Sequence, residues 1–256
     1  MHLHPLAAFT DNYIWVLHNG ARALVVDPGE AAGVQAYLAE HRLTLDTILI
    51  THHHGDHTGG VPALRKATGA RVIGPVVESM PEPLQRVAGG QMVEALGLRF
   101  AVIDVPGHTA GHIAYYLEEM DGAPLLFCGD TLFSAGCGRL FEGTPAQMLA
   151  SLSRLAALPA ATRVCCTHEY TLSNLRFAQT VEPGNTALTQ YRQWCDAQRA
   201  QNLPTLPSTI GLEQAINPFL RGHLPMLAVA ALAHNPACGN DPLAVFSTLR
   251  EWKNVF

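Results

Sequence analysis

The sequence is poor in charged residues, and it lacks the features that attach a protein to nucleic acid or to a membrane. Only 14% of its 256 residues are charged, and the formal net charge is −5. A chain of this charge offers no basic surface to follow a phosphate backbone, which argues against a nucleic-acid partner. No apolar run is long enough to span a bilayer, and the first residues lack the basic and apolar regions of a secretory signal. We therefore expect a globular, monomeric protein of the cytoplasm that binds neither membrane nor nucleic acid.

The cysteines show no spacing that would predict a disulfide framework or a Cys-x-x-Cys site. The six are Cys128, Cys137, Cys165, Cys166, Cys195 and Cys238. In a reducing compartment such residues are expected to be buried, small apolar side chains. Cys137 lies between two glycines and is a candidate for an exposed thiol near a site. Nothing in its sequence context predicts a nucleophilic role.

Histidine, by contrast, is abundant, and much of it lies in one short loop. The segment 51–60 reads Thr-His-His-His-Gly-Asp-His-Thr-Gly-Gly. It follows an apolar, β-branched run at 47–50, which predicts a buried strand, and it precedes a helical pattern at 61–68. The loop therefore lies at the C-terminal end of a strand, where a rigid scaffold can position side chains.

Four side chains of this loop can bind metal: His52, His54, Asp56 and His57. In an extended loop, alternate residues face the same way, so His52 and His54 can bind one ion. Asp56 and His57 can both turn to a second ion only if the loop curls, which Gly55 permits. Imidazole and carboxylate at this density suit zinc, iron or manganese better than calcium or magnesium.

Three later apolar runs end in the same manner, each followed by a histidine or an aspartate. They are the predicted strands 102–105 before His108, 125–128 before Asp130 and 164–166 before His168. Strands that bring ligands together from distant points in the sequence build a preorganised metal site. The pattern therefore predicts one metal centre assembled at the C-terminal ends of several strands.

Short strands alternate with single helices as far as Cys166, which predicts an α/β fold with helices covering the faces of sheets. The expected strands include a hairpin of 12–17 and 23–26 around Asn19-Gly20, and runs at 71–74 and 99–104. A helix is expected at 31–41. Beyond residue 171 the patterns are helical, at 171–181, 185–201, 226–235 and 241–253, and no strand is expected. We place a domain boundary near residue 170, which gives domains 1–170 and 171–256.

The loop at 51–60 resembles the His-x-His-x-Asp-His signature of the metallo-β-lactamase superfamily. Further segments narrow the resemblance to glyoxalase II, the hydroxyacylglutathione hydrolases. These segments are 129–133, 136–139, 141–143 and 168–171, followed in the tail by 181–185, 217–221 and 250–253. The resemblance covers essentially the whole chain, including the helical tail that most of the superfamily lacks.

This resemblance implies an αββα sandwich with a C-terminal all-helical domain that binds glutathione, and a centre of two divalent metal ions. Zinc is the expected metal, with iron or manganese as alternatives. The first ion would take His52, His54 and His108, and the second Asp56, His57 and His168. Asp130 would bridge the two ions together with a hydroxide. His53 is expected to point away, and His112 to pack behind the ligands.

The implied activity is hydrolysis of S-(2-hydroxyacyl)glutathione, such as S-D-lactoylglutathione, to glutathione and a 2-hydroxy acid such as D-lactate. In this family it is the second step of methylglyoxal detoxification. The metal-bridged hydroxide would attack the thioester, with Asp56 and Asp130 as catalytic residues. The implied substrate-binding residues are Arg139, Phe141, Tyr170, Arg250 and Lys253. Phe141 stands where some members have tyrosine, so one hydroxyl contact to glutathione would be missing.

Other functions fit the sequence less well. A secreted β-lactamase would need a signal peptide, and a persulfide dioxygenase would use one iron and lack the long tail. An RNA-processing nuclease of the superfamily would need a basic surface. A non-catalytic binder of metal or glutathione conflicts with the complete set of seven ligands, and binding without turnover would identify it.

Overall fold

The computed structural model describes residues 1–256, and its centre is a pair of six-stranded sheets. In the first sheet the strands lie in chain order. They are β1 (His2–Ala8), β2 (Asn12–His18), β3 (Arg22–Val26), β4 (Thr44–Leu49), β5 (Arg71–Pro75) and β6 (Gln85–Val87). The strands from β3 to β6 run parallel, so the C-terminal ends of β4 and β5 meet at the same edge.

The second sheet has the order β14-β13-β10-β9-β8-β7 and is mostly antiparallel. Its strands are β7 (Met92–Ala95), β8 (Leu98–Asp104), β9 (Ile113–Met120), β10 (Ala123–Gly129), β13 (Arg163–Cys166) and β14 (Ser208–Thr209). A small hairpin of β11 (Leu132–Phe133) and β12 (Gly136–Cys137) follows β10.

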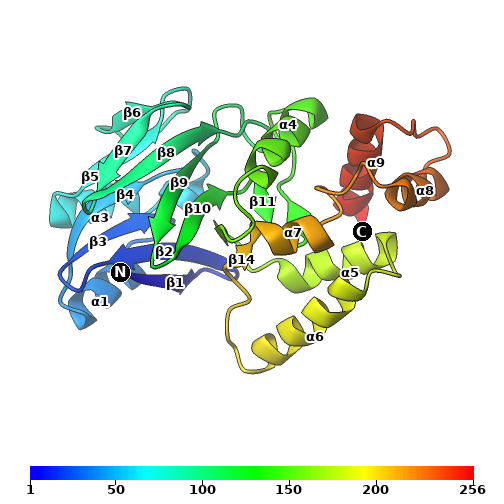
Figure 1. The fold of residues 1–256 in the computed structure, drawn as a ribbon. Coiled ribbons are helices and arrows are strands. Elements are labelled where there is room, and N and C mark those ends of the chain that lie inside the picture. Colours follow the sequence, from blue (N-terminus) through cyan, green and yellow to red (C-terminus); the bar gives the residue numbers. More distant parts are fainter.

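Helices cover both outer faces of the pair of sheets, as Figure 1 shows. The helices α1 (Ala32–Glu40) and α3 (Val61–Thr68) lie on the first sheet, and α4 (Pro145–Ala156) lies on the second. Strand β2 is buried on both faces: Trp15 joins the core between the sheets, while Val16 packs towards α1 and α3. Alternate side chains of a strand point to opposite faces, so this burial places β2 inside an αββα sandwich.

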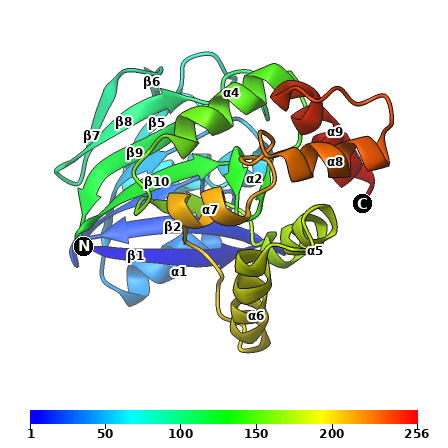
Figure 2. The ribbon, with the colours of Figure 1, turned by 45° about the vertical axis from the view of Figure 1, so that its right-hand side comes forward.

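The C-terminal residues form a set of helices at one end of the sandwich, seen on the same side in Figures 1 and 2. They are α5 (Thr171–Val181), α6 (Thr186–Ala200), α7 (Ile210–Ile216), α8 (Pro225–His234) and α9 (Pro242–Val255). We call residues 171–256 the helical tail. Its strand β14 pairs with β13, so the tail also contributes to the second sheet. The division of the chain into domains at residue 170 stays a prediction.

The α/β layers, the hairpin of β2 and β3 and the four long helices of the tail confirm the expectations from the sequence. Several elements were not expected, namely the strands β1, β6, β7, β9, β11 and β12, the helices α4 and α7, and the strand β14 in a tail predicted to have none. Of these, β14 has two residues and α7 has seven, too few for a periodic pattern to be recognised.

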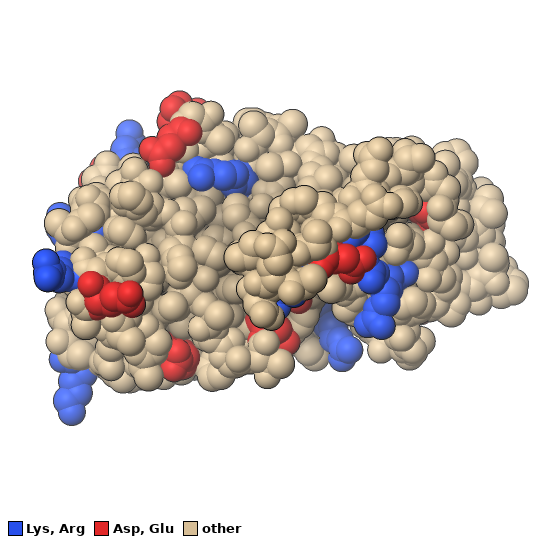
Figure 3. All heavy atoms as spheres, turned by 90° about the horizontal axis from the view of Figure 1, so that it is seen from below, with Lys and Arg blue, Asp and Glu red and all other residues tan.

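The charged residues are sparse on the surface as well as in the sequence. The face drawn in Figure 3 is mostly uncharged, and its basic and acidic side chains lie in small separate groups. No helix combines the length and the apolar character needed to cross a membrane.

A group of imidazoles joins β1, β2 and α1 on the first sheet. The ring centroids of His4 and Tyr37 lie 4.8 Å apart in a stacked arrangement, as do those of His2 and His18. Burial lowers the pKa of His4, and the neighbouring His41 lowers this pKa further. Burial and the surrounding histidines also lower the pKa of His18. The folded protein therefore resists protonation of His4 and His18 more than the unfolded chain does.

We expect this group to make the protein less stable as the pH falls below about 6.5, the ordinary pKa of histidine. The unfolded chain binds these protons more readily, so the contribution is complete above that pH and is lost as the pH falls towards the lowered pKa. The variant His4→Gln should lose less free energy of unfolding between about pH 8 and about pH 5.5 than the native chain. Urea unfolding measures this difference, and His223→Gln, an exposed histidine outside the group, is the control. Equal pH dependence in His4→Gln and the native chain would contradict the assignment.

Candidate metal centre and its cavity

The histidine-rich loop leaves the C-terminal end of β4 and turns into a short helix, α2 (Gly55–Thr58). The curl expected at Gly55 is confirmed, but its cause differs. Gly55 has no positive φ, and a Cβ there would meet open space. The close packing lies instead at Gly60, where an added Cβ would come within 2.4 Å of the backbone of Glu30. The loop is therefore held against the segment that follows β3.

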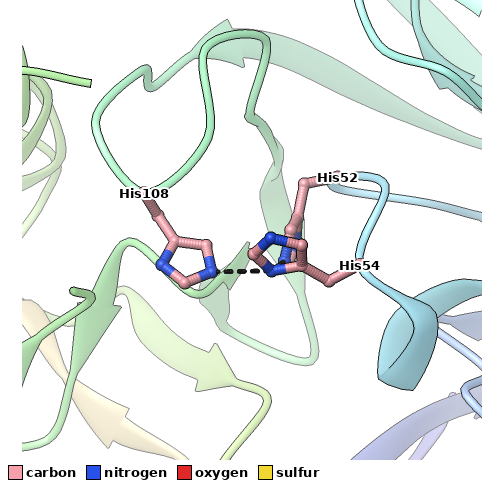
Figure 4. Close-up of side chains that lie close together, drawn as sticks. All are labelled: His52, His54 and His108. Atoms are coloured by element: carbon pink, nitrogen blue, oxygen red, sulfur yellow. Dashed lines mark hydrogen bonds between the residues drawn. The ribbon is translucent and has the colours of Figure 1, made fainter. Parts of the chain in front are cut away.

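Three histidines converge from two loops, as Figure 4 shows. Nδ1 of His54 lies 3.1 Å from Nε2 of His52 and 3.1 Å from Nε2 of His108. His52 and His108 are buried, and His54 is partly exposed. Three imidazole nitrogens at such distances form a group that can hold one metal ion, and here this group is open on one side.

A second group contains Asp56, His57 and His168. Oδ2 of Asp56 lies 3.5 Å from Nε2 of His57 and 3.5 Å from Nε2 of His168. His168 follows β13 of the second sheet, whereas the other two residues belong to α2 on the first sheet. The edge where the two sheets meet therefore brings these three side chains together.

Asp130 lies between the two groups and turns one carboxylate oxygen to each. Its Oδ2 is 3.4 Å from Nε2 of His108, and its Oδ1 is 3.4 Å from Nε2 of His57 and of His168. The backbone N–H of Asp130 donates to Nε2 of His112 at 3.1 Å, which fixes the backbone that carries the carboxylate. The structure thus brings together all seven residues that the sequence predicted as ligands, and their service as ligands stays a prediction.

The outward nitrogens of the histidines meet partners that orient the rings. Nδ1 of His108 donates to the carbonyl of Arg139 at 2.8 Å, and Nδ1 of His168 lies 2.7 Å from Oδ1 of Asp11. Nδ1 of His57 lies 3.1 Å from Oδ2 of Asp27. Such partners set the tautomer and the direction of a ligating imidazole.

Sequence reasoning missed three of these supporting residues: Asp11, Asn12 and Asp27. The amide of Asn12 donates to Oδ2 of Asp56 at 3.1 Å. Asp27 accepts from both the backbone N–H and the hydroxyl of Thr51, at 2.8 and 2.7 Å. A signal for Asp27 existed, because it directly follows an apolar strand, as the predicted ligands do. Asp11 precedes a strand and Asn12 begins it, so neither carries such a signal.

The charges and the burial of the side chains in the centre make the space between them favourable for a cation. Burial lowers the pKa of His52 well below its usual value, so this imidazole stays neutral with a free lone pair. Burial alone would raise the pKa of Asp130, but His57 and His168 hold it well below its usual range, so the carboxyl is ionised. For His57, burial opposes protonation, yet Asp130 and Asp27 raise its pKa.

These residues fit divalent metal ions. Nε2 of His57 and Oδ1 of Asp130 are buried and have no hydrogen-bond partner. Buried polar atoms left unpaired are costly, and a cation between them satisfies both. The donor set of imidazole nitrogens and carboxylate oxygens is the one that zinc, iron and manganese take.

The two other histidines of the motifs behave as expected from the sequence. His53 turns away, with Nδ1 3.0 Å from Oε2 of Glu78 and Nε2 3.4 Å from Oε1 of Glu142. His112 is buried behind the centre, where its ring stacks on that of His52 with centroids 4.5 Å apart. Two further groups can hold a metal: His52, His57 and Asp130, which overlaps the centre itself, and His53, His54 and Glu142, which shares His54 with the first group.

A cavity of about 470 Å³ opens beside the two groups. This volume falls in the range of pockets that enclose small ligands. All five residues predicted to bind substrate line it: Arg139, Phe141, Tyr170, Arg250 and Lys253. Phe141 is 63% exposed at the mouth, and its ring makes T-shaped pairs with those of His54 and His108. The ring of Tyr170 stacks on that of His168 at 4.7 Å.

Cys137 of this cavity is more buried than the sequence suggested, and Arg250 beside it is buried as well. All six cysteines are buried and unpaired, as expected, and this includes Cys137, which was the candidate for an exposed thiol. Burial raises the pKa of Cys137, so its thiol is not activated. Arg250 is only 5% exposed; its guanidinium donates to the carbonyl of Cys137 at 2.7 Å and to Asn254 at 3.1 Å.

Comparison with known proteins agrees with this geometry over the full chain. Residues 8–168 match the family model of the metallo-β-lactamase superfamily, and residues 169–256 match that of the hydroxyacylglutathione hydrolase C-terminus. A protein from Albidiferax ferrireducens named hydroxyacylglutathione hydrolase is 64% identical over 256 residues, which is 100% of both chains.

Solved structures show the same fold. The crystal structure of ETHE1 from Myxococcus xanthus is 25% identical with a TM-score of 0.66, and the match covers 100% of this chain and 99% of that one. The crystal structure of TTHA1623 in a di-iron-bound form is 26% identical with a TM-score of 0.62, over 86% of this chain and 100% of that one. The family models, the full-length identity and the fold agree: the chain belongs to the hydroxyacylglutathione hydrolase family of the metallo-β-lactamase superfamily.

Proposed function

We propose that this protein is a thioester hydrolase that converts S-(2-hydroxyacyl)glutathione, such as S-D-lactoylglutathione, into glutathione and a 2-hydroxy acid, as in methylglyoxal detoxification. The observation that carries the proposal is the position of Asp130. This carboxylate lies between two groups of three ligands and faces a cavity lined by three cationic side chains. Membership of the hydroxyacylglutathione hydrolase family supports the choice of substrate.

The proposed centre holds two divalent ions, most suitably zinc. His52, His54 and His108 would hold one ion, Asp56, His57 and His168 the other, and Asp130 both. Each group would offer three side chains besides the shared carboxylate, and both groups border the cavity, from which water and substrate would reach the ions. Two ions held by these residues would supply a nucleophile from water at neutral pH and would polarise the thioester carbonyl.

The site suits a thioester, because the leaving group of a thioester needs little protonation from the chain's own side chains. The leaving group is a thiolate whose parent thiol has an ordinary pKa near 8.5, so it departs with little help from an acid. Asp56 is partly exposed towards the cavity, and Asn12 fixes its Oδ2. We assign Asp56 the transfer of the proton released from the attacking water, in addition to ligation. Tyr170 and Phe133 enclose His168 and limit the access of bulk water.

The cavity suits the charges of glutathione, which carries two carboxylates and one ammonium. We assign Arg139, Arg250 and Lys253 to its carboxylates and Tyr170 to a hydrogen bond, with Phe141 as an apolar wall at the mouth. Guanidinium and ammonium groups in a partly enclosed cavity form strong charge-assisted hydrogen bonds with carboxylates. Lys253 stands near the wall formed by α5, with Nζ 3.4 Å from the hydroxyl of Ser173.

We also assign the two domains, the cellular compartment and the oligomeric state. We propose that residues 1–170 form the catalytic domain and that residues 171–256 form a domain which completes the glutathione site. Six buried, unpaired cysteines suit a reducing compartment, and we assign the protein to the cytoplasm as a monomer.

The proposal is tested by measuring hydrolysis of S-D-lactoylglutathione by the purified protein, with metal content determined on the same sample. We expect efficient turnover with about two metal ions per chain. The variant His54→Ala should lose both turnover and part of the metal, because His54 lies between the other two nitrogens of its group. Metal without turnover would discard the substrate, oxygen uptake would indicate a dioxygenase, and a folded protein that binds no metal would overturn the mechanism.

A further inference from the structure

The short hairpin after Asp130 is held mainly by the helical tail, with one side-chain hydrogen bond from Cys128 of the sheet from which it emerges. Its strands β11 and β12 pair only with each other, and the turn between them contains Ala135 with a φ of +54°. That conformation is uncommon for a residue with a Cβ and persists only where the surroundings impose it. We call residues 133–137 the hairpin turn.

Each residue of the hairpin turn has a backbone group bound by a side chain of the tail. The backbone N–H of Ala135 donates to Oε2 of Glu213 at 2.8 Å. The amide of Asn217 donates to the carbonyls of Phe133 (3.0 Å) and Gly136 (2.9 Å). The amide of Asn174 donates to the carbonyl of Ser134 at 3.0 Å. Arg250 donates to the carbonyl of Cys137 at 2.7 Å. Turns more often satisfy such groups with water or their own backbone, so this degree of side-chain support is specific.

Glu213 is the group on which this support centres. It lies on α7, is 0% exposed, and its Oε2 receives the Ala135 N–H and also lies 3.0 Å from the amide of Asn217. Burial raises the pKa of Glu213, so the side chain serves as a fixed acceptor more than as a charge. Asn217 opens the segment 217–221, one of the segments by which the tail resembles its family, and the proposed reaction gives it no role.

The hairpin turn is connected on both sides to the metal centre. On one side it follows Asp130, and the backbone N–H of Gly138 closes the hairpin on the carbonyl of Thr131 at 3.2 Å. On the other side it leads to Arg139, whose carbonyl accepts from Nδ1 of His108. A Cβ on Gly138 would lie 2.0 Å from the carbonyl oxygen of Asp130, so the two sides of the hairpin are in close contact. A shift of the turn therefore moves both Asp130 and the partner that orients His108.

We propose that Glu213 is a positioning residue for the metal centre: through Ala135 and Asn217 it holds the hairpin turn that places Asp130 and the carbonyl of Arg139. The helical tail then has a second task besides lining the cavity, because the geometry of the shared carboxylate depends on α7. This inference rests on the proposed function.

The test compares Glu213→Ala with two matched variants in the full-length, metal-loaded protein. In Glu213→Ala the metal affinity, measured by competition with a chelator, and kcat should each fall about tenfold, as is usual when a partner behind a ligand is lost. KM should change less than kcat, because Phe141, Tyr170 and Lys253, which are assigned to glutathione, lie outside the hairpin turn. Glu213→Gln, which keeps an acceptor oxygen of the same size, should restore both quantities to within about threefold of the native values.

Glu182 provides the control for general destabilisation. It is also a buried carboxylate of the tail, but it pairs with Arg221 at 2.6 Å and with Asn185 at 2.9 Å, away from the hairpin turn. Glu182→Ala should lower Tm while leaving metal affinity and kcat unchanged. The absorption spectrum of the cobalt-substituted protein should change in Glu213→Ala and not in Glu182→Ala, which separates a moved ligand from a weaker fold.

A double variant keeps the test decisive if Glu213→Ala does not fold. Ala135→Gly removes the strain of the positive φ, so the turn depends less on the hydrogen bond to Glu213. In the Ala135→Gly background, the Glu213→Ala variant should fold. There the substitution should lower metal affinity less than it does in the native chain. Equal losses in Glu182→Ala and Glu213→Ala, or a native cobalt spectrum in Glu213→Ala, would overturn the inference. Failure of the proposed function would instead appear in the native chain, as missing turnover or missing metal.

Discussion

Asp130→Asn is expected to reduce kcat by about 10²–10⁴-fold and to lower the metal content of the purified protein. Asparagine keeps the volume of aspartate but has an NH2 group in place of one carboxylate oxygen. This group donates hydrogen bonds and does not bind metal. Removing one partner from a buried set of charges costs about 3–5 kcal/mol, and each 1.36 kcal/mol corresponds to about a factor of ten. Of the two carboxylates among the seven, only Asp130 lies within 3.4 Å of imidazole nitrogens of both groups. Its loss should therefore affect both ions, not one.

The measurement combines steady-state hydrolysis of S-D-lactoylglutathione with metal analysis before and after dialysis against a chelator. Asp46→Asn is a suitable control, because Asp46 is a partly buried aspartate near the other end of β4 that pairs with Arg22 outside the centre. This control should keep activity and metal within about twofold of the native chain. If Asp130→Asn retained two ions and turnover within about tenfold, the role of Asp130 as the shared ligand would be refuted.

The ligands could be predicted from the sequence because each one lies just after the end of a predicted strand. An apolar run predicts where a strand stops, and a histidine or aspartate beyond it projects from the edge of the sheet. This held for His52, His108, Asp130 and His168, which follow β4, β8, β10 and β13. Only the assignment of ligands to one ion or the other required the family resemblance, since spacing along the chain does not show which loops face each other.

The supporting residues depend on tertiary pairing and were not predictable in this way. Asp11 reaches His168 because an isolated bridge joins Asn12 to His168 across 156 positions of the sequence. Nothing near Asp11 in the chain indicates that contact. Likewise, a helical pattern at 241–253 suggests a solvated face for Arg250, whereas the hairpin turn covers this side chain and leaves it 5% exposed. Sequence patterns predict which elements form, and the packing between distant elements decides which polar residues become buried.

Lys253→Met is expected to raise KM for S-D-lactoylglutathione by about 10–100-fold with little change in kcat. A hydrogen bond to a charged group contributes about 1.5–3 kcal/mol, and Lys253 lines the cavity at a distance from the proposed ligands along α9. Loss of a contact made equally in the ground state and in the transition state raises KM and leaves kcat unchanged. The chain has one other lysine, Lys66, which is exposed on α3, so Lys66→Met is a matched control that should leave KM unaltered.

The pH profile makes this prediction specific to the ammonium charge. Burial lowers the pKa of Lys253 to about 8, with further contributions from Arg250, Arg176 and Arg139. The ammonium that binds a carboxylate is present below this pKa and is lost above it, so kcat/KM should fall as the pH rises through about 8. Lys253→Arg should remove that decline, because a guanidinium stays charged throughout this range. A profile that is identical in the native chain and in Lys253→Arg would show that the alkaline limb belongs to another group, and a KM unchanged in Lys253→Met would remove this residue from the binding site.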